Sequence, residues 1–114
     1  MRTIIAGGRD VTSHGYLVKA LLNCGWRPTV VLSGAARGAD TLGEEWARMC
    51  GILLEKYPAN WNEHGKRAGF LRNTAMAENA EALIALWDGQ SHGTAHMIET
   101  ARRCGLRVHV ERVG

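Results

Sequence analysis

Three glycine-rich stretches of this sequence have the residue types of an anion-binding loop. They read AGGRD at residues 6–10, SGAARGAD at 33–40 and WDGQSHGT at 87–94, and each follows a short apolar run. Glycine lets the backbone adopt a positive φ and lets several amide N–H groups converge on one phosphate. A single stretch of this kind is more often a tight turn from a strand into a helix. Three of them favour a phosphate site.

Basic and aromatic side chains accompany these stretches. Arg9, Arg37, Lys66 and Arg72 lie in or beside them, and arginine binds phosphate through a bidentate fork. Trp61 stands in a polar segment, where stacking on a base would explain an exposed indole. The predicted ligand-binding residues from these segments are Gly7, Gly8, Arg9, Ser33, Gly34, Ala35, Arg37, Gly38, Ala39, Asp40, Trp61, Lys66, Arg72, Asp88, Gly89, Gly93 and Thr94. The amides of 34–39 and 93–94 are expected to hold the phosphate.

The carboxylates near these stretches have two interpretations each. Asp40 either binds a ligand hydroxyl or stabilises the first turn of a helix through the helix dipole. Asp10 and Asp88 are adequately explained by Asx turns, in which the side chain bonds the backbone just beyond it. The sequence contains neither the dinucleotide motif G-x-G-x-x-G nor a P-loop, and no hydrolase G-x-S-x-G surrounds Ser33.

The elements that must position these residues follow from the apolar pattern. Strands are predicted at 3–6, 29–32, 52–57, 82–87 and 107–110. Helices are predicted at 16–24, 39–50, 66–79 and 94–104. The runs do not alternate between apolar and polar, as in strands buried on both faces. The longest connection, residues 57–69, is expected to be an ordered loop.

Alternating strands and helices predict an α/β fold. We expect a Rossmann-like three-layer sandwich of about five mostly parallel strands with helices on both faces, as one domain over residues 1–114. Ligands of such sheets bind beyond the carboxyl ends of the strands. Within the predicted helix 39–50, Leu42, Trp46 and Met49 share one face, and Glu44, Glu45 and Arg48 share the other.

Composition limits the class of protein. The 114 residues carry a net charge of +3 with no basic run, and no apolar stretch is long enough to cross a membrane. Because residues 1–10 do not resemble a signal peptide, a cytoplasmic location is expected. The three cysteines are expected to be small buried hydrophobes at helix ends, each followed by a left-handed glycine. The five histidines lack metal-ligand spacing, so we expect no metal and no cofactor.

Taken together, four segments give the chain a resemblance to the SLOG superfamily, named for the DNA-processing and Lonely Guy proteins, and within it to a small YspA-like, single-domain branch. The segments are GGRD at 7–10, SGAARGAD at 33–40, YPANWNEHGKRAGFLRNTAMA at 57–77 and ALIALWDGQSHGT at 82–94. The resemblance implies a Rossmann-like sheet that binds a nucleotide or a nucleotide-derived ligand such as ADP-ribose. A homo-oligomer is also expected, because a sheet of 114 residues has limited surface for enclosing a nucleotide and related proteins often pair.

Lonely Guy enzymes cleave the N-glycosidic bond of nucleoside 5′-monophosphates. Their R-K-x-x-M pattern is similar to Arg72-Asn73 and the residues after it, which adds Asn73 to the predicted site. Their G-G-x-G-T-x-x-E pattern is similar to the segment that begins at Ser91 and adds that residue too, but Met97 stands where the glutamate belongs. Methionine can neither stabilise an oxocarbenium-like state nor activate water.

Three functions therefore remain open. The favoured one is a sensor or sequestering protein that binds a nucleotide-derived ligand. The alternative is a nucleotide N-glycosidase (phosphoribohydrolase) of Lonely Guy type, whose candidate catalytic residues are Arg72, Asp40 and Glu44. Single-stranded nucleic-acid binding comes third, because it needs a basic groove with interleaved aromatic residues and the basic residues here are scattered.

Overall fold

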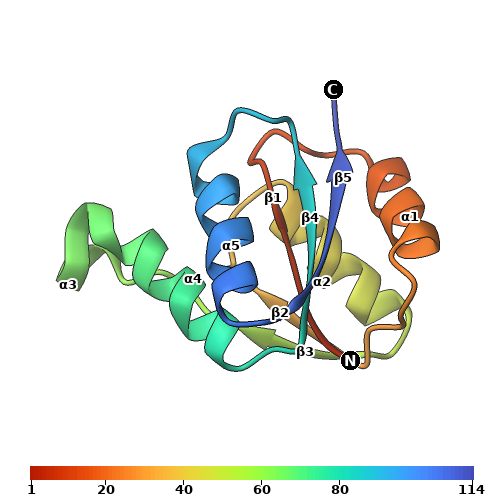
Figure 1. Ribbon diagram of the computed structural model, residues 1–114, viewed down its shortest axis with the longest axis horizontal. Coiled ribbons are helices and arrows are strands. Elements are labelled where there is room, and N and C mark those ends of the chain that lie inside the picture. Colours follow the sequence, from red (N-terminus) through yellow and green to blue (C-terminus); the bar gives the residue numbers. More distant parts are fainter.

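The computed structural model describes residues 1–114 and contains one five-stranded sheet (Figure 1). The strands are β1 (Arg2–Gly7), β2 (Val30–Ser33), β3 (Leu53–Lys56), β4 (Ala82–Trp87) and β5 (Arg107–Arg112). Each expected strand is present, and the bounds of β4 agree with the sequence pattern at both ends. The predicted α/β fold is confirmed.

The sheet is parallel throughout, in the order β3-β2-β1-β4-β5. In the register of the central pair, Ile4 lies opposite Leu83 and Gly7 opposite Leu86. The chain leaves β1 for its neighbour β2 and later returns to β4 on the other side of β1. The order therefore reverses between β1 and β4, and their carboxyl ends form the topological switch point at which such sheets bind ligands.

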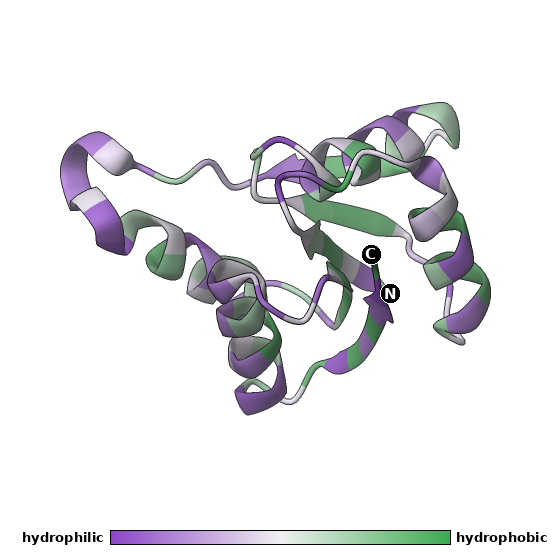
Figure 2. Ribbon diagram, turned by 90° about the horizontal axis from the view of Figure 1, so that it is seen from above, coloured by the Kyte–Doolittle hydropathy of each residue, from purple (hydrophilic) through white to green (hydrophobic).

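Helices cover both faces of the sheet, which makes the sandwich three-layered (Figure 1). On one face lie α1 (His14–Asn23) and α2 (Ala39–Met49). On the other lie α4 (Ala68–Glu78) and α5 (His92–Arg103). In Figure 2 the central strands are mostly hydrophobic and the helices carry both colours, as expected for amphipathic helices on a buried sheet.

Two apolar clusters hold the layers together. Ile5 and Val31 belong to the cluster under α1 and α2, and Leu83 and Met97 belong to the one under α4 and α5. The side chains of Trp26, Trp46 and Trp87 pack against these clusters.

The predicted faces of α2 are partly wrong. Glu44 is buried and Met49 is 79% exposed. Gly43 lies so close to β1 that an added Cβ would come within 2.8 Å of the Ile5 side chain. Small residues of α2 therefore face the strand, which turns Glu44 inward and Met49 outward.

The expectation for the cysteines is also partly wrong. Cys24 is buried at the end of α1, but Cys50 and Cys104 are exposed. All three stand at the ends of helices. The glycines after them, Gly25, Gly51 and Gly105, all have positive φ as predicted.

The segment 57–69 is an arm rather than a simple loop. It contains α3 (Trp61–His64) and the 3₁₀ helix η1 (Gly65–Arg67), and it leads into α4. Figure 1 shows α3 well away from the sheet. The Asn60 side chain caps α3 by accepting a hydrogen bond from the N–H of Glu63. The arm approaches the carboxyl edge of the sheet from the α4 side.

Candidate functional site

A pocket of about 660 Å³ opens at the switch point. Most of its lining comes from the segment after β1, the start of α2, the arm with α4, and the first turns of α5; Tyr16, Asp88 and Val113 complete it. This volume lies within the range of small-molecule binding sites. A second, smaller hollow of about 410 Å³ shares Arg9, Ala36, Trp61 and Arg72 with it. The pocket lies at the carboxyl edge of the sheet, where the glycine-rich stretches that follow the strands are expected.

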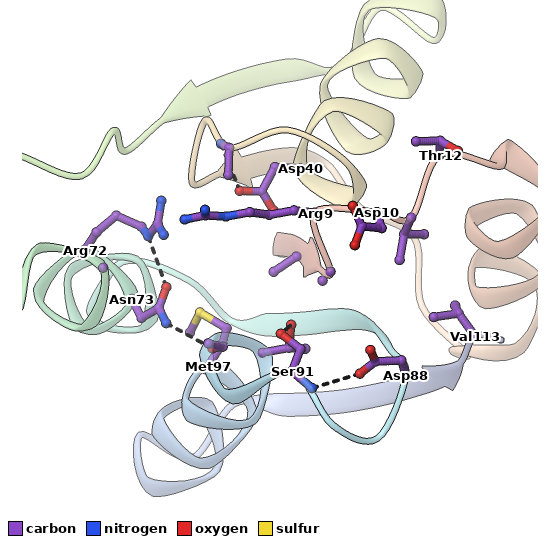
Figure 3. A pocket seen from close by; sticks show the side chains of 18 of the residues that line it. Arg9, Asp10, Thr12, Asp40, Arg72, Asn73, Asp88, Ser91, Met97 and Val113 are labelled. Atoms are coloured by element: carbon purple, nitrogen blue, oxygen red, sulfur yellow. Dashed lines mark hydrogen bonds between the residues drawn. The ribbon is translucent and has the colours of Figure 1, made fainter. Parts of the chain in front are cut away.

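Two arginines converge on this pocket. Figure 3 shows the Arg9 side chain extended toward the guanidinium of Arg72. The nearby charge of Arg9 contributes to lowering the pKa of Arg72, after burial, which is the larger cause. Two like charges held this close favour an anion between them.

Arg72 is fixed in place by the neighbouring backbone. It donates hydrogen bonds to the carbonyl of Gly34 and, over 3.1 Å, to the Asn73 side chain. A Cβ at Gly34 would come within 2.5 Å of the Arg72 guanidinium. Gly34 is therefore small so that the arginine can lie across the turn.

Asp40 is the buried carboxylate of the pocket. It is 6% exposed and accepts a hydrogen bond of 3.2 Å from the N–H of Ala36. Burial raises the pKa of Asp40 to about 6, against the opposing effects of the Ala36 N–H and the charge of Arg72. Asp40 stands in the first turn of α2 and also lines the pocket, so its position is compatible with both interpretations.

Three N–H groups of the turn at 33–39 already have hydrogen-bond acceptors within the protein. The N–H of Ala35 donates to Ser33 Oγ, that of Ala36 to Asp40, and that of Ala39 to the carbonyl of Gly8. The expected phosphate cradle thus has internal acceptors at three of its N–H groups. The structure instead offers the guanidinium groups of Arg9 and Arg72, and the turn holds Arg72 through the Gly34 carbonyl.

Glu44 lies behind the turn. Ser33 Oγ donates a hydrogen bond of 2.6 Å to it, and the side chains of Arg48 and Lys56 are each 3.6 Å away. Glu44 lines neither hollow, so its contacts hold Ser33 and the turn in position.

The first turn of α5 faces the same pocket. Ser91, Gly93 and Thr94 line it, and the Ser91 and Thr94 hydroxyls lie 3.2 Å apart. The first N–H groups of a helix have no partner within the helix, and Ser91 does not cap them with its side chain. They are therefore available to an anion.

Asn73 joins this turn to Arg72. Its amide accepts from Arg72, donates to the Gly93 carbonyl over 3.4 Å and lies 3.1 Å from His96 Nδ1. The Arg72 side chain and the start of α5 therefore share one hydrogen-bonded connection.

The sequence comparisons give the family. The profile of the YspA, cpYpsA-related SLOG family (YAcAr) matches residues 1–64. The "Gene 61 protein" of Mycobacterium phage D29 is 40% identical over 85 residues, which cover 69% of this chain and 68% of the phage protein. The chain belongs to this SLOG family.

Several predicted residues of this SLOG protein meet at the pocket, and others do not. Those that line it are Gly7, Gly8, Arg9, Asp40, Trp61, Lys66, Arg72, Asn73, Asp88, Ser91, Gly93 and Thr94. Gly34, Ala35 and Arg37 line the smaller hollow. Ser33, Gly38, Ala39 and Gly89 line neither.

Some predicted glycines have a structural reason within the fold. At Gly7 an added Cβ would lie 2.2 Å from the Leu86 carbonyl oxygen. At Gly38, where φ is +78°, it would lie 2.4 Å from the backbone oxygens of Gly8 and Arg9. These two glycines let β1, β4 and α2 approach one another at the switch point.

Asp88 forms the predicted Asx turn. Its Oδ1 accepts hydrogen bonds of 2.8 Å from the N–H groups of both Gln90 and Ser91. These bonds lower the pKa of Asp88. Asp88 thereby orients the loop that enters α5.

Met97 occupies the floor of the SLOG pocket. Its side chain is 1% exposed and belongs to the apolar cluster under α5. The position at which Lonely Guy enzymes carry a glutamate is thus apolar here. Asp40 is the buried carboxylate that remains in the pocket lining.

Sequence reasoning missed one end of the pocket. Val11, Thr12, Ser13, Tyr16 and Val113 line it there. These residue types carry no recognisable pattern, and Val113 reaches the site only because β5 pairs with β4. The place of residues 11–13 after β1 was the available signal, since segments beyond strand ends form such sites.

No helix of this protein combines the length and the apolar character needed to span a bilayer.

Proposed function

We propose that this SLOG protein binds a nucleotide or nucleotide-derived ligand at the switch point and acts as a sensor or sequestering protein. The observation that carries the proposal is the convergence of Arg9 and Arg72 on one pocket. Two guanidinium groups that face each other repel, and a bound phosphate relieves that repulsion through charge-assisted hydrogen bonds. The free N–H groups at the start of α5 add favourable dipoles to the same pocket.

The arm supplies the group that recognises a base. Trp61 lines the pocket with its side chain 51% exposed, beside a glycine, Gly69, that leaves room for the ring. An exposed indole stacks on a nucleobase through its π face. Phosphate binding at the arginines and stacking at the arm together select nucleotides over inorganic anions.

The first experiment compares AMP and adenosine by isothermal titration calorimetry. Arg72→Ala is expected to weaken AMP binding about tenfold or more, since a charge-assisted pair contributes roughly 1.5–3 kcal/mol, and to leave adenosine binding nearly unchanged. Arg67→Ala is the matched control, because Arg67 is exposed on the same arm and lines neither hollow. Equal losses for AMP and adenosine would contradict the assignment of Arg72 to the phosphate.

One observation favours the second candidate function, hydrolysis of a nucleotide N-glycosidic bond. Asp40 combines burial, a place in the pocket lining and a pKa of about 6, which suits a general acid or base near neutral pH. Incubation with AMP followed by chromatography distinguishes the two functions. A binder returns AMP unchanged, whereas a hydrolase releases adenine and ribose 5-phosphate and loses that activity in Asp40→Asn.

A further inference from the structure

The last strand, β5, has one edge that no other strand covers. It stands at the end of the strand order and pairs with β4 alone. The N–H of Arg107 donates to the Glu81 carbonyl, so the odd-numbered residues of β5 direct their peptide groups toward β4. Because these groups alternate between the two sides of a strand in a parallel sheet, three residues direct theirs outward: Val108, Val110 and Arg112. Such a row of free N–H and C=O groups can pair with an added strand.

A hollow of about 400 Å³ lies beside this edge, on the face that α5 covers. Trp87 and Ile98 line it. Trp87 is opposite Arg112 in the register of β4 and β5. Val108 and Val110 of β5 are only partly buried, and they pack against the same apolar cluster to which Ile98 belongs. In Figure 2, β5 alternates between hydrophilic and hydrophobic residues, unlike the central strands. The free edge of β5 and this hollow together are called the β5 surface below.

The β5 surface is positively charged. Arg102 and Arg103 line the hollow, and Arg112 extends from β5 on the same face as Trp87. All three arginines are exposed, and none of them forms an ion pair within the protein. Glu99 is the one carboxylate in the lining of the hollow. The excess of positive charge favours an acidic partner.

The combination of features decides which kind of partner fits. Pairing of β5 with β5 of a second copy about a two-fold axis brings the same arginine-rich surfaces together, so like charges repel. A nucleic acid would contact the arginines through its phosphates but would leave the outward peptide groups and the apolar hollow without partners. An extended acidic peptide uses the peptide groups, the hollow and the charges at once.

We propose that the β5 surface docks an extended acidic segment of a partner protein. The segment adds a strand beside β5 and forms hydrogen bonds with the outward peptide groups of Val108 and Val110. Side chains two residues apart on a strand share a face. An apolar side chain of the segment therefore enters the hollow at Trp87, and carboxylates two residues before and after it face Arg102 and Arg112. The inference goes beyond nucleotide binding and does not depend on it, because the hollow shares no residue with the ligand pocket.

The probe is a fluorescein-labelled peptide with the sequence Thr-Glu-Thr-Leu-Thr-Glu-Thr, which places both glutamates and the leucine on one face of a strand. Fluorescence anisotropy is expected to show saturable binding to the full chain. The matched peptide Thr-Lys-Thr-Leu-Thr-Lys-Thr is expected to bind about tenfold more weakly or less, because its ammonium groups meet the arginines. Absence of saturable binding by the acidic peptide, or equal binding of both peptides, overturns the proposal.

Val110→Pro tests the added strand. It removes an outward N–H, and an edge strand tolerates proline where that N–H faces solvent. The acidic peptide is expected to bind about fivefold more weakly or less, since a hydrogen bond is lost and the ring obstructs the edge. Val110→Thr is the matched control, because it keeps the N–H and the shape of the side chain, and it keeps the affinity within about twofold. Thermal unfolding checks that both variants are folded. Equal affinities of the two variants contradict strand addition.

Arg102→Glu tests the charge, and it serves also if Val110→Pro does not fold. It is expected to weaken the acidic peptide about tenfold and to strengthen the lysine peptide. Arg67→Glu makes the same change of net charge at an exposed residue of the arm, away from the β5 surface, and leaves both affinities within about twofold. Equal losses in the two variants would mean attraction by net charge alone and would overturn the proposal.

Two further measurements detect the other occupants. In analytical ultracentrifugation, Val110→Pro is expected to leave the molecular mass unchanged. A wild-type dimer that this variant dissociates would assign the edge to a second copy. A labelled single-stranded oligonucleotide is expected not to displace the acidic peptide. Displacement, together with unchanged oligonucleotide binding by Val110→Pro, would assign the surface to nucleic acid. Either result overturns the proposal.

Discussion

At the scale of single residues, Asp40 and the two arginines form a charge arrangement that is incomplete. Asp40 sits beside the repelling pair and is so buried that its pKa is raised to about 6. One carboxylate that is protonated near pH 6 cannot neutralise two guanidinium groups. Within this group of three side chains, one guanidinium charge therefore remains uncompensated, and ionisation of the buried Asp40 carboxyl lowers the stability of the fold.

The stability cost of Asp40 has a definite pH dependence. The carboxyl pKa is raised from 3.8 to about 6 in the folded protein, so the folded state binds its proton more tightly than the unfolded state does. The cost is absent below about pH 4 and complete above about pH 6. Asp40→Asn removes the charge and keeps an acceptor for the Ala36 N–H.

We therefore predict that Asp40→Asn is more stable than the wild type at pH 7.5, by roughly 2–3 kcal/mol of unfolding free energy. The difference closes as the pH falls to about 4, because the wild-type carboxyl is then neutral too. Urea unfolding of both proteins across this range measures it. A variant that is less stable at pH 7.5 would show that ionised Asp40 is a net stabilising group.

At the level of helices and strands, the atoms around each glycine distinguish glycines needed for close packing from glycines that face the pocket. The sequence alone does not separate these two roles. Gly7 and Gly38 serve close packing of β1, β4 and α2. Gly93, in the first turn of α5, has no atom within 4 Å of an added Cβ. Only the last of these is free of a packing role, and it lines the pocket.

This contrast gives a prediction for two alanine variants. Gly7→Ala forces the Leu86 carbonyl and Ala39 to move, and it is expected to lower the free energy of unfolding by about 1–3 kcal/mol. Gly93→Ala meets open space within a helix and is expected to be neutral or to add up to roughly 1 kcal/mol. Thermal and urea unfolding distinguish them. Equal destabilisation by both variants would contradict the packing role of Gly7.

Much of the element pattern could be predicted from the sequence, because buried parallel strands are continuous apolar runs. The helix α3 was missed because its four residues carry no apolar periodicity. Its cap was nevertheless readable: Asn60 followed by Glu63 has the spacing of a capping box, and Asn60 Oδ1 accepts a hydrogen bond of 3.2 Å from the Glu63 N–H.

The candidate site was harder to predict than the fold. Residue type identified Arg9 and Arg72, but only the structure brings their side chains together. The sequence could not reveal that the N–H groups of Ala35, Ala36 and Ala39 donate to acceptors within the protein. Those acceptors belong to side chains and backbone whose positions depend on tertiary packing.

At the scale of the whole molecule, the strand order decides where a ligand can bind. Because β1 pairs with both β2 and β4, the segments that follow β1, β2 and β4 open toward one place. The arm approaches that place from one face of the sheet and α1 from the other. The pocket is thus a consequence of topology, and the side chains lining it select the ligand.

Binding of a nucleotide-derived ligand at this switch point can be observed residue by residue. The experiment is a titration of the ¹⁵N-labelled protein with ADP-ribose, followed by amide chemical shifts in NMR spectra. We expect the largest saturable shifts at Gly7, Gly8, Gly93 and Thr94 and at the Trp61 indole. Small shifts are expected around the separate hollow lined by Trp87, Glu99 and Arg103. Absence of saturable shifts at the switch point, or larger ones at that hollow, would contradict binding at the switch point.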